Sequence, residues 1–198
     1  MINETTYITT YHKYWLNKEQ GIKNPQANQD TLSILDLKNC EETVYTKGIA
    51  HFWEKICVHM EELIEWLDDE DELDNIHMVI VPSSTANQWS PSLIKIAGKI
   101  IDEFNNPDFL NGYKFFYIED ALVRKNTIDK LAHGGNRSIH VHNESISVKN
   151  PNKIRGKKIL LIDDITTTGN SLLACAEKLM DAGATDIFPF AIGKSNED

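Results

Sequence analysis

The sequence predicts an α/β protein whose mainly parallel, doubly wound sheet is covered by helices on both faces. Short apolar runs at residues 78–81, 159–162 and 187–192 have the continuous hydrophobicity of strands that are buried on both faces. Each of the first two runs is followed by a segment whose apolar residues have helical spacing, and one such segment precedes the first run. Strands that alternate with amphipathic helices are typical of this fold class.

Three amphipathic helices are predicted. The first covers residues 46–67 and ends at the acidic stretch 68–74. The second opens with Ser90 as its N-cap and Pro91 in its first turn, and the third covers residues 171–182, where Gly183 fits a C-terminal cap. The side chains expected to point inward from the second helix are Leu93, Ile94, Ala97, Ile100, Ile101 and Phe104.

The other segments complete the predicted organisation. Residues 114–118 and 146–148 are strand candidates, and residues 149–156 connect to the next strand. The polar segment 124–143, which contains Gly134 and Gly135, predicts a long loop. Residues 7–15 alternate like a strand and residues 24–30 are typical of a loop, but this part fits the alternating scheme poorly. We therefore predict an N-terminal extension or hood at residues 1–45 and an α/β core at residues 46–198.

Composition excludes several classes of protein. The chain has 198 residues, enough for one good core, and no apolar stretch approaches the roughly 18 residues of a membrane span. The first residues lack the order of a signal peptide, so a soluble, cytoplasmic protein without membrane contact is expected. Three separated cysteines, Cys40, Cys57 and Cys175, predict reduced thiols. A net charge of −10 argues against direct nucleic-acid binding, although the local excess of base in residues 114–158 suits either a polyanionic small ligand or a solvated face.

Residues 158–171 combine an apolar strand, an acid pair, a hydroxylated loop and a helix start. At the carboxyl edge of a parallel sheet, such a turn directs backbone N–H groups and a helix N-terminus at a ligand, which suits a phosphate. Gly169 permits a positive φ, and nearby hydroxyls add donors. Asp163 and Asp164 would repel a phosphate, so they need sugar hydroxyls or a hydrated divalent cation. A phosphorylated sugar satisfies both halves of the segment.

This segment has two other interpretations. Asp163 and Asp164 are also common at the start of a turn, and Thr167 or Thr168 could simply cap a helix. A cap explains one hydroxyl and leaves the acid pair unexplained. A Walker A loop is excluded because the segment has no GK[ST] sequence.

Residues 162–171, Ile-Asp-Asp-Ile-Thr-Thr-Thr-Gly-Asn-Ser, resemble the signature with which type I phosphoribosyltransferases bind 5-phosphoribosyl-1-pyrophosphate (PRPP). The resemblance implies that Asp163 and Asp164 contact the ribose 2- and 3-hydroxyls, and that Mg²⁺ arrives with PRPP and reaches both carboxylates through water. It also implies that the 5-phosphate is held by Thr166, Thr167, Thr168, Gly169, Asn170 and Ser171.

Two further segments follow the order used by this family. The loop after the first apolar strand resembles the one that holds pyrophosphate, through Ser83, Ser84, Thr85 and Ala86. Residues 124–137 stand where the family keeps a mobile catalytic loop, with Arg124, Lys125 and Arg137 as catalytic candidates. Their spacing is closest to the ComF-like branch, and the resemblance covers roughly residues 76–192. The chain lacks the cysteine zinc module of many ComF-like proteins, and Thr167 stands where purine-using members place an acid.

Three other groups of residues are candidates for a site. Basic residues on the expected loop, including Lys130, are ordinarily solvated, but one or more could reach pyrophosphate. His133, His140 and His142 suggest a metal cluster, with the last two on one face of a strand, but no third ligand follows. Trp89 could stack on a base or a partner, whereas the other tryptophans suit a core or helix face.

The family resemblance implies a function in nucleotide metabolism. An enzyme of this kind transfers the phosphoribosyl group of magnesium-PRPP to a nitrogen nucleophile, a nucleobase or an amine, and releases pyrophosphate. The alternative is a non-catalytic protein that senses PRPP or a nucleotide, or a ComF-like accessory protein that serves a partner such as DNA-handling machinery. A hydrolase or a PRPP-making enzyme is a third interpretation, and the absence of an ATP motif argues against synthesis. A homodimer is implied by the resemblance alone.

Overall fold

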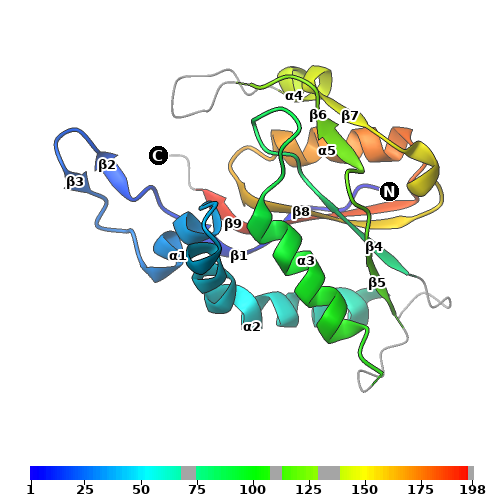
Figure 1. The fold of residues 1–198 in the computed structure, drawn as a ribbon, viewed down its shortest axis with the longest axis horizontal. Coiled ribbons are helices and arrows are strands. Elements are labelled where there is room, and N and C mark those ends of the chain that lie inside the picture. The colour runs from blue at the N-terminus through cyan, green and yellow to red at the C-terminus, as the bar shows by residue number, and fades with distance from the viewer. Residues whose placement is uncertain (68–74, 108–112, 129–138, 196–198) are drawn as a thin grey trace.

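A computed structural model describes residues 1–67, 75–107, 113–128 and 139–195, and its centre is a five-stranded sheet (Figure 1). The strand order is β1-β9-β8-β4-β5, and each neighbouring pair is parallel. The strands are β1 (Thr6–Tyr11), β4 (Ile76–Ile80), β5 (Phe115–Tyr117), β8 (Lys158–Thr166) and β9 (Asp186–Ser195). The predicted α/β fold with a mainly parallel sheet is confirmed.

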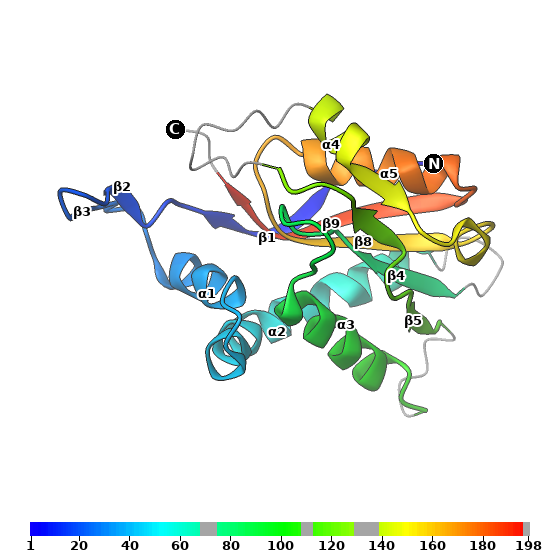
Figure 2. The same ribbon diagram turned by 45° about the horizontal axis from the view of Figure 1, so that its top comes forward.

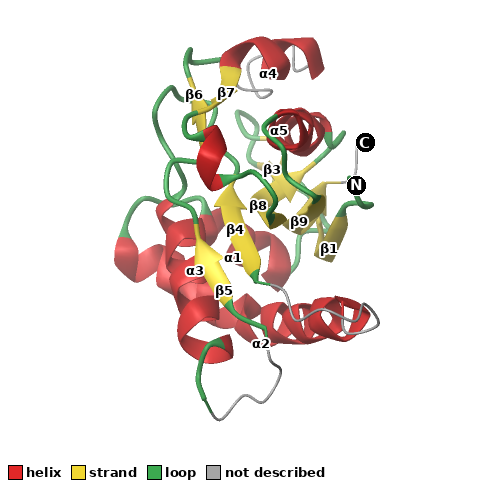
Figure 3. Ribbon diagram, turned by 90° about the vertical axis from the view of Figure 1, so that its right-hand side faces the viewer, coloured by secondary structure: helices red, strands yellow, loops and turns green. Residues whose placement is uncertain are grey.

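Helices cover both faces of this sheet, as Figure 3 shows in an end-on view. Helix α3 (Pro91–Phe104) connects β4 to β5 and shares one face with α1 (Gln29–Leu37) and α2 (Glu42–Leu67). Helix α5 (Asn170–Asp181) connects β8 to β9 and covers the other face. The two crossovers run in opposite directions along the sheet, and right-handed crossovers then place their helices on opposite faces. The result is the doubly wound arrangement that the sequence predicts.

Two hydrophobic cores explain why the strands are apolar without interruption. Side chains alternate between the faces of a strand, so successive residues enter different cores. In β8, Leu160 and Ile162 pack with the core under α1, α2 and α3, while Ile159 and Leu161 pack with the core under α5. Burial on both faces therefore requires apolar residues at every position of the central strands.

The predicted helices are present, with differences at their boundaries. Helix α2 begins at Glu42, four residues before the predicted start, and α3 begins at Pro91 after Ser90, whose side chain makes no capping hydrogen bond. Gly183 follows α5 with a φ of 95°, as expected for a C-terminal cap. Ile94 was expected to point inward, but its side chain is exposed, and Ile96 is buried in α3 instead. Among the described residues, no helix is both long and apolar enough to cross a bilayer.

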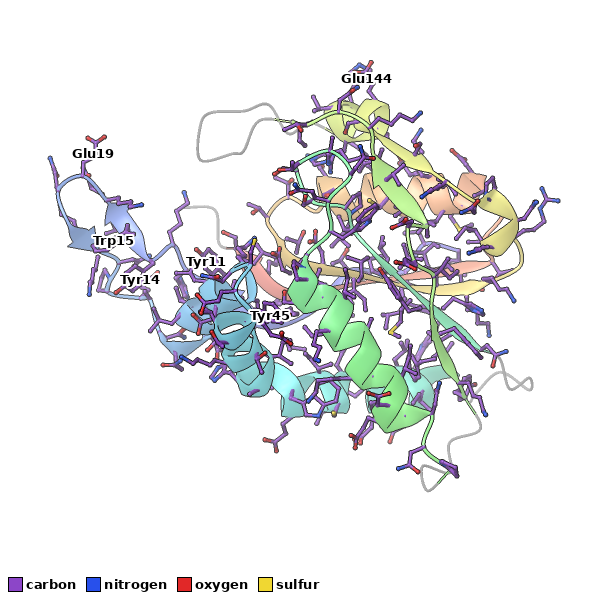
Figure 4. The ribbon with its side chains drawn as sticks, viewed as in Figure 1. Tyr11, Tyr14, Trp15, Glu19, Tyr45 and Glu144 are labelled. Atoms are coloured by element: carbon purple, nitrogen blue, oxygen red, sulfur yellow. The ribbon has the colours of Figure 1, made fainter. Side chains whose placement is uncertain are left out.

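The N-terminal segment divides into parts with different positions. β1 joins the main sheet as a parallel neighbour of β9, whereas β2 (Trp15–Asn17) and β3 (Ile22–Lys23) form an antiparallel hairpin. Figure 2 shows that this hairpin projects from the body of the protein, and Figure 4 shows Tyr14, Trp15 and Glu19 on it. The chain then returns as α1, which sequence analysis did not predict and which packs on α2. The helices approach closely at Gly48, where a Cβ atom would lie 2.6 Å from the Ser33 carbonyl oxygen.

A small second sheet lies over the α5 face. Its strands β6 (Leu122–Arg124) and β7 (Ile146–Val148) are antiparallel, and helix α4 (Ile139–Ser145) precedes β7. The predicted loop at residues 124–143 is therefore shorter than expected, because its last part is helical; residues 129–138 lie outside the described residues. A 3-10 turn, η2 (Pro151–Lys153), lies within the predicted connection to β8.

Candidate functional site

The two predicted ligand loops leave adjacent strands at the same edge of the sheet. β4 pairs with β8 in parallel register, with Ile80 opposite Ile162, and the backbone N–H of Val81 donates to the carbonyl oxygen of Ile162 at 3.0 Å. From β4 the chain goes to β5 on one side, whereas β8 continues to β9 on the other side. The carboxyl ends of β4 and β8 thus lie at the point where strand order reverses, which is where ligands bind in open α/β sheets.

The acid pair lies within β8, not in the loop that follows it. The strand was expected to end at residue 162, but it continues to Thr166, and Asp163 is paired with Ala191 of β9. Hydrogen bonding to the neighbouring strand explains the extension, because β9 also continues past the apolar segment to Ser195. Each carboxylate accepts a hydrogen bond from the next backbone N–H: Asp163 from Asp164 at 2.9 Å, and Asp164 from Ile165 at 2.6 Å.

The two carboxylates have different surroundings. Successive side chains of a strand point to opposite sides of the sheet. Burial raises the pKa of the Cys175 thiol on α5, the charge of Asp163 raises it further, and the charge of Arg124 lowers it. Asp163 is therefore close to the α5 side of the sheet. Asp164 instead forms an ion pair with Lys38, whose Nζ lies 3.0 Å from each carboxylate oxygen. The acid pair therefore connects the α5 side of the sheet with the α1 side.

Lys38 and Tyr11 bring the N-terminal segment to this site, and sequence analysis did not identify either. Lys38 follows the last residue of α1, and Tyr11 ends β1, where the hairpin joins the body of the protein (Figure 4). The pKa of Tyr11 is raised, mainly by burial. The charge of Lys38 acts in the opposite direction, and the charge of Asp164 adds to the increase. A lysine after a helix is too common to indicate a site, so no pattern in the sequence could have selected Lys38.

The hydroxylated loop after β8 ends in a left-handed glycine at the start of a helix. Gly169 has φ 80° and ψ −6°, and its carbonyl oxygen accepts from Leu173 N–H at 2.8 Å as α5 begins. A Cβ atom at Gly169 would meet nothing within 4 Å, so the positive φ is the reason for glycine here. Thr166 is buried, whereas Thr168 is exposed. The first N–H groups of α5 lack intrahelical partners and make an N-terminus that favours an anion.

The predicted pyrophosphate loop is held in place by its own backbone and by residues 124–128. Ser83 N–H donates to the carbonyl of Gln88 at 2.9 Å, and the side chain of Ser83 donates to the carbonyl of Thr85 at 3.2 Å. Ala86 N–H donates to Thr127 Oγ1 at 3.0 Å, while Ile128 N–H donates to the carbonyl of Ser84 at 2.9 Å. The loop after β4 and the segment after β6 therefore form one hydrogen-bonded unit.

Arg124 is part of this unit and is not a solvated loop residue. It is 1% exposed at the end of β6, and its guanidinium donates to the carbonyl of Ser83 at 2.6 Å and to Ser145 Oγ at 2.5 Å. Lys125 has an exposed side chain, and its backbone N–H donates to the carbonyl of Ser145 at 2.7 Å. Lys130 and Arg137, the other basic candidates, lie outside the described residues.

The predicted strand placement is wrong for His140 and His142, the two of these histidines that the structure describes. His140 and His142 lie on helix α4, not on a strand, because the segment forms a helical turn over α5. His142 is buried with Nδ1 3.4 Å from Arg124 Nη2, whereas His140 is exposed and its Nε2 lies 3.3 Å from a carboxylate oxygen of Glu144. His133 lies outside the described residues. Among the residues that the structure describes, no group of three His, Cys, Asp or Glu side chains is placed to hold a metal ion.

Trp89, which was predicted to stack on a base or a partner, also contributes to the packing of the fold. Its indole Nε1 donates to the carbonyl oxygen of Leu122 at 3.0 Å, and its half-buried ring packs against the core under α2 and α3.

A cavity of about 400 Å³ lies elsewhere, between α2 and the sheet, lined by residues that include His59, Trp66 and Phe188. None of its lining residues belongs to the predicted ligand site.

Comparison with protein families gives a match that covers most of the chain. The family model of the phosphoribosyl transferase domain matches residues 53–188, which include β4, β8, the acid pair and α5. The chain belongs to the phosphoribosyl transferase domain family. The matched region of this phosphoribosyl transferase domain begins within α2, so β1, the hairpin and α1 precede it. No curated protein sequence gives a significant match to the chain.

Proposed function

We propose that this phosphoribosyl transferase domain binds magnesium-PRPP at the carboxyl ends of β4 and β8 and transfers its phosphoribosyl group to a nitrogen nucleophile. A bond forms between the nitrogen and C1 of the ribose, and the bond from C1 to the pyrophosphate oxygen breaks. Pyrophosphate leaves with the electron pair of that bond, and the nitrogen gives up its proton to water. The observation that carries this proposal is the continuous path from the acid pair in β8 through Gly169 into the N-terminus of α5.

The 5-phosphate is assigned to the start of α5. Backbone N–H groups at a helix N-terminus and the positive end of its dipole bind an anion without any lysine. Gly169, with its positive φ, directly precedes α5, and the residues around it with hydroxyl donors are Thr166, Thr167, Thr168 and Ser171. Asn170, the first residue of α5, completes the loop.

The acid pair is assigned to the ribose. Ionised carboxylates accept hydrogen bonds, and vicinal hydroxyls of a sugar donate them in the matching arrangement. Holding both hydroxyls would fix the ring while C1 gains positive character in an oxocarbenium-like transition state. Asp163 and Asp164 then act by orienting the sugar, and little covalent chemistry is required of the protein.

The donor set fits a magnesium ion that arrives with its ligand. Carboxylate oxygens are among the ligands that Mg²⁺ prefers, usually as one or two carboxylates plus substrate phosphates and water. Asp163 and Asp164 offer this partial set, and the described residues include no cluster of three potential ligands. The ion would supply positive charge to the leaving pyrophosphate. We assign the remaining contacts with the leaving pyrophosphate to polar groups of the Ser83–Ala86 loop and to the cations Lys125 and Arg137, with Arg124 holding the loop.

The acceptor is proposed to be a nucleobase or an amine with a nucleophilic nitrogen. Thr167 cannot take the proton that an acid at this position would take in purine-using enzymes, so a purine handled in that way is disfavoured. Trp89 remains a candidate for stacking on the acceptor. A homodimer and the ComF-like assignment also remain proposals that rest on the resemblance.

A non-catalytic PRPP-binding protein is the second candidate. It is favoured by the burial of Arg124, because a guanidinium that is 1% exposed and bonded to Ser83 and Ser145 is poorly placed to follow a leaving group. In that case the same site would sense PRPP or a nucleotide and report to a protein partner.

Isothermal titration of PRPP with Mg²⁺ into the protein tests the site. The variant Asp163→Asn/Asp164→Asn should bind at least about tenfold more weakly, since hydrogen bonds to charged groups contribute about 1.5–3 kcal/mol each. The control Asp102→Asn/Glu103→Gln removes two adjacent exposed carboxylates from α3 and should bind like the parent. Equal affinities for the parent and the acid-pair variant would reject the assignment of the acid pair.

Pyrophosphate release separates the two candidate functions. The parent is incubated with magnesium-PRPP and a panel of nucleobases and amines, and pyrophosphate is measured over time. Release that depends on both PRPP and an acceptor supports transfer. Binding without release for any acceptor supports the sensing protein.

A further inference from the structure

The ion pair between Lys38 and Asp164 joins residues 126 positions apart in the sequence. Lys38 Nζ lies 3.0 Å from both Oδ1 and Oδ2 of Asp164, so it faces the carboxylate symmetrically. The position of Lys38 is set by the end of α1, where its backbone N–H donates to the carbonyl of Ile34 at 3.2 Å. The N-terminal segment thus contributes a cation to an acid pair that lies in the region matched by the family.

The ion pair is only partly exposed to solvent. The Lys38 side chain is 43% exposed, whereas that of Asp164 is 18% exposed. The ammonium group of Lys38 therefore faces the carboxylate of Asp164 in a half-buried place, where opposite charges attract each other more strongly than in bulk water.

Charge at this site determines how well it can bind a polyanion. Two adjacent carboxylates repel phosphate groups, and the repulsion is felt over several ångströms in a half-buried site. Lys38 neutralises one of the two charges. An ionised carboxylate has about four acceptor positions, so Asp164 can bind Lys38 and still accept hydrogen bonds from a sugar.

We propose that Lys38 is a positioning residue of the ligand site, a counter-cation that holds Asp164 for the sugar hydroxyls and reduces the repulsion between the acid pair and the ligand phosphates. This inference rests on the proposed binding of magnesium-PRPP. It assigns part of the site to the segment before residue 53, outside the region that the family model matches.

A purely structural role for Lys38 can be separated from this one, because the chain contains a matched ion pair. Lys55 Nζ lies 3.2 Å from Asp30 and fastens the first turn of α1 to α2, and its side chain is 47% exposed, close to that of Lys38. If Lys38 only fastened α1, losing either lysine would have a similar effect. If Lys38 acts through the acid pair, only its loss affects the ligand.

The experiment compares Lys38→Met, Lys38→Arg and Lys55→Met with the parent in isothermal titrations of magnesium-PRPP. Met keeps the length of the side chain and removes the charge, whereas Arg keeps the charge. We expect Lys38→Met to bind about tenfold to a hundredfold more weakly, and both Lys38→Arg and Lys55→Met to stay within about threefold of the parent. Thermal unfolding of each variant verifies folding, and Lys38→Gln replaces Lys38→Met if that variant does not fold.

The outcomes are distinct. Absence of binding by the parent contradicts the proposed function itself. Binding by the parent with equal affinity for Lys38→Met overturns only the role of Lys38, as does an equal loss in Lys55→Met or a failure of Lys38→Arg to restore binding.

Discussion

Arg124 Nε lies 2.6 Å from the backbone carbonyl oxygen of Ser83, and this hydrogen bond joins the end of β6 to the loop after β4. The same guanidinium donates to Ser145 Oγ, so one buried side chain connects three segments that are distant in the sequence. Asn87 N–H donates to the carbonyl of Arg124 at 3.0 Å and closes the unit. The conformation of the Ser83–Ala86 loop therefore depends on Arg124, which belongs to the small second sheet over α5.

Replacement of Arg124 by alanine should destabilise the protein. The change leaves the carbonyl of half-buried Ser83 and the hydroxyl of buried Ser145 without their donor, and we expect the free energy of unfolding to fall by about 2–4 kcal/mol. Urea unfolding measures this difference. The control Lys125→Ala removes the neighbouring exposed side chain and should change stability by no more than about 0.5 kcal/mol. Similar values for the two variants would show that the Arg124 contacts contribute little.

Gly169 should not tolerate a side chain, although there is space for one. Its φ of 80° is costly for other residues, so Gly169→Ala should lower stability by about 1–2 kcal/mol and weaken PRPP binding through the displaced N-terminus of α5. Gly98 is the matched control, because it lies inside α3 and a Cβ atom added there would also meet nothing within 4 Å. Gly98→Ala should raise stability by about 0.5–1 kcal/mol. The same sign for both variants in urea unfolding would contradict this account.

Stability should depend on the ionisation of Asp30. Burial raises its pKa, but hydrogen bonds from Thr9, His51 and Lys55 and the charge of Lys55 lower it more, to about 2 from an ordinary value of 3.8. A carboxyl whose pKa is lower in the folded protein stabilises the fold above its unfolded pKa, and this contribution is lost as the pH falls from about 4 to about 2. The shift corresponds to at most roughly 2 kcal/mol at neutral pH, because solvent screens part of the charge of Asp30.

Comparison with Asp30→Asn measures this contribution. The parent should be more stable than the variant in urea at pH 7, and the difference should narrow as the pH falls through the range from about 4 to about 2, since protonation removes the same charge. A difference that is constant over this range would mean that the contacts of Asp30 do not depend on its charge.

The three thiols should react at different rates. Cys40 is exposed and Cys57 is half-buried, whereas Cys175 is fully buried, where desolvation and Asp163 raise its pKa. Because the thiolate is the reactive form, a disulfide exchange reagent should label Cys40 first and Cys175 only after unfolding. Counting labelled thiols by mass spectrometry, with and without denaturant, checks the order. Labelling of Cys175 in the native protein would show that α5 opens readily.

The central fold could be predicted because its physical signal is local. A strand buried on both faces needs apolar residues throughout, and a surface helix needs an apolar stripe, so β4, β8, β9 and the helices α2, α3 and α5 are visible as patterns. Ile94 was misassigned because the stripe of α3 is wide, and only packing decides which residue at its border is covered. Helix α4 was missed because its seven residues, which include two histidines, are too few to show a sustained period.

The acid pair and Gly169 could be chosen as site candidates from the sequence alone, because one short segment contains a strand, two carboxylates and a helix start. The loop at Ser83 lies near the acid pair because β4 pairs with β8, and Lys38 meets Asp164 although the two residues are 126 positions apart. No local pattern in the sequence encodes such contacts. The sequence by itself thus determined the fold class and selected one segment as the candidate ligand site. The tertiary structure alone decided that Arg124 is buried beneath its neighbour loop and that a lysine from the N-terminal segment meets Asp164, because pairing and packing between distant segments set those distances.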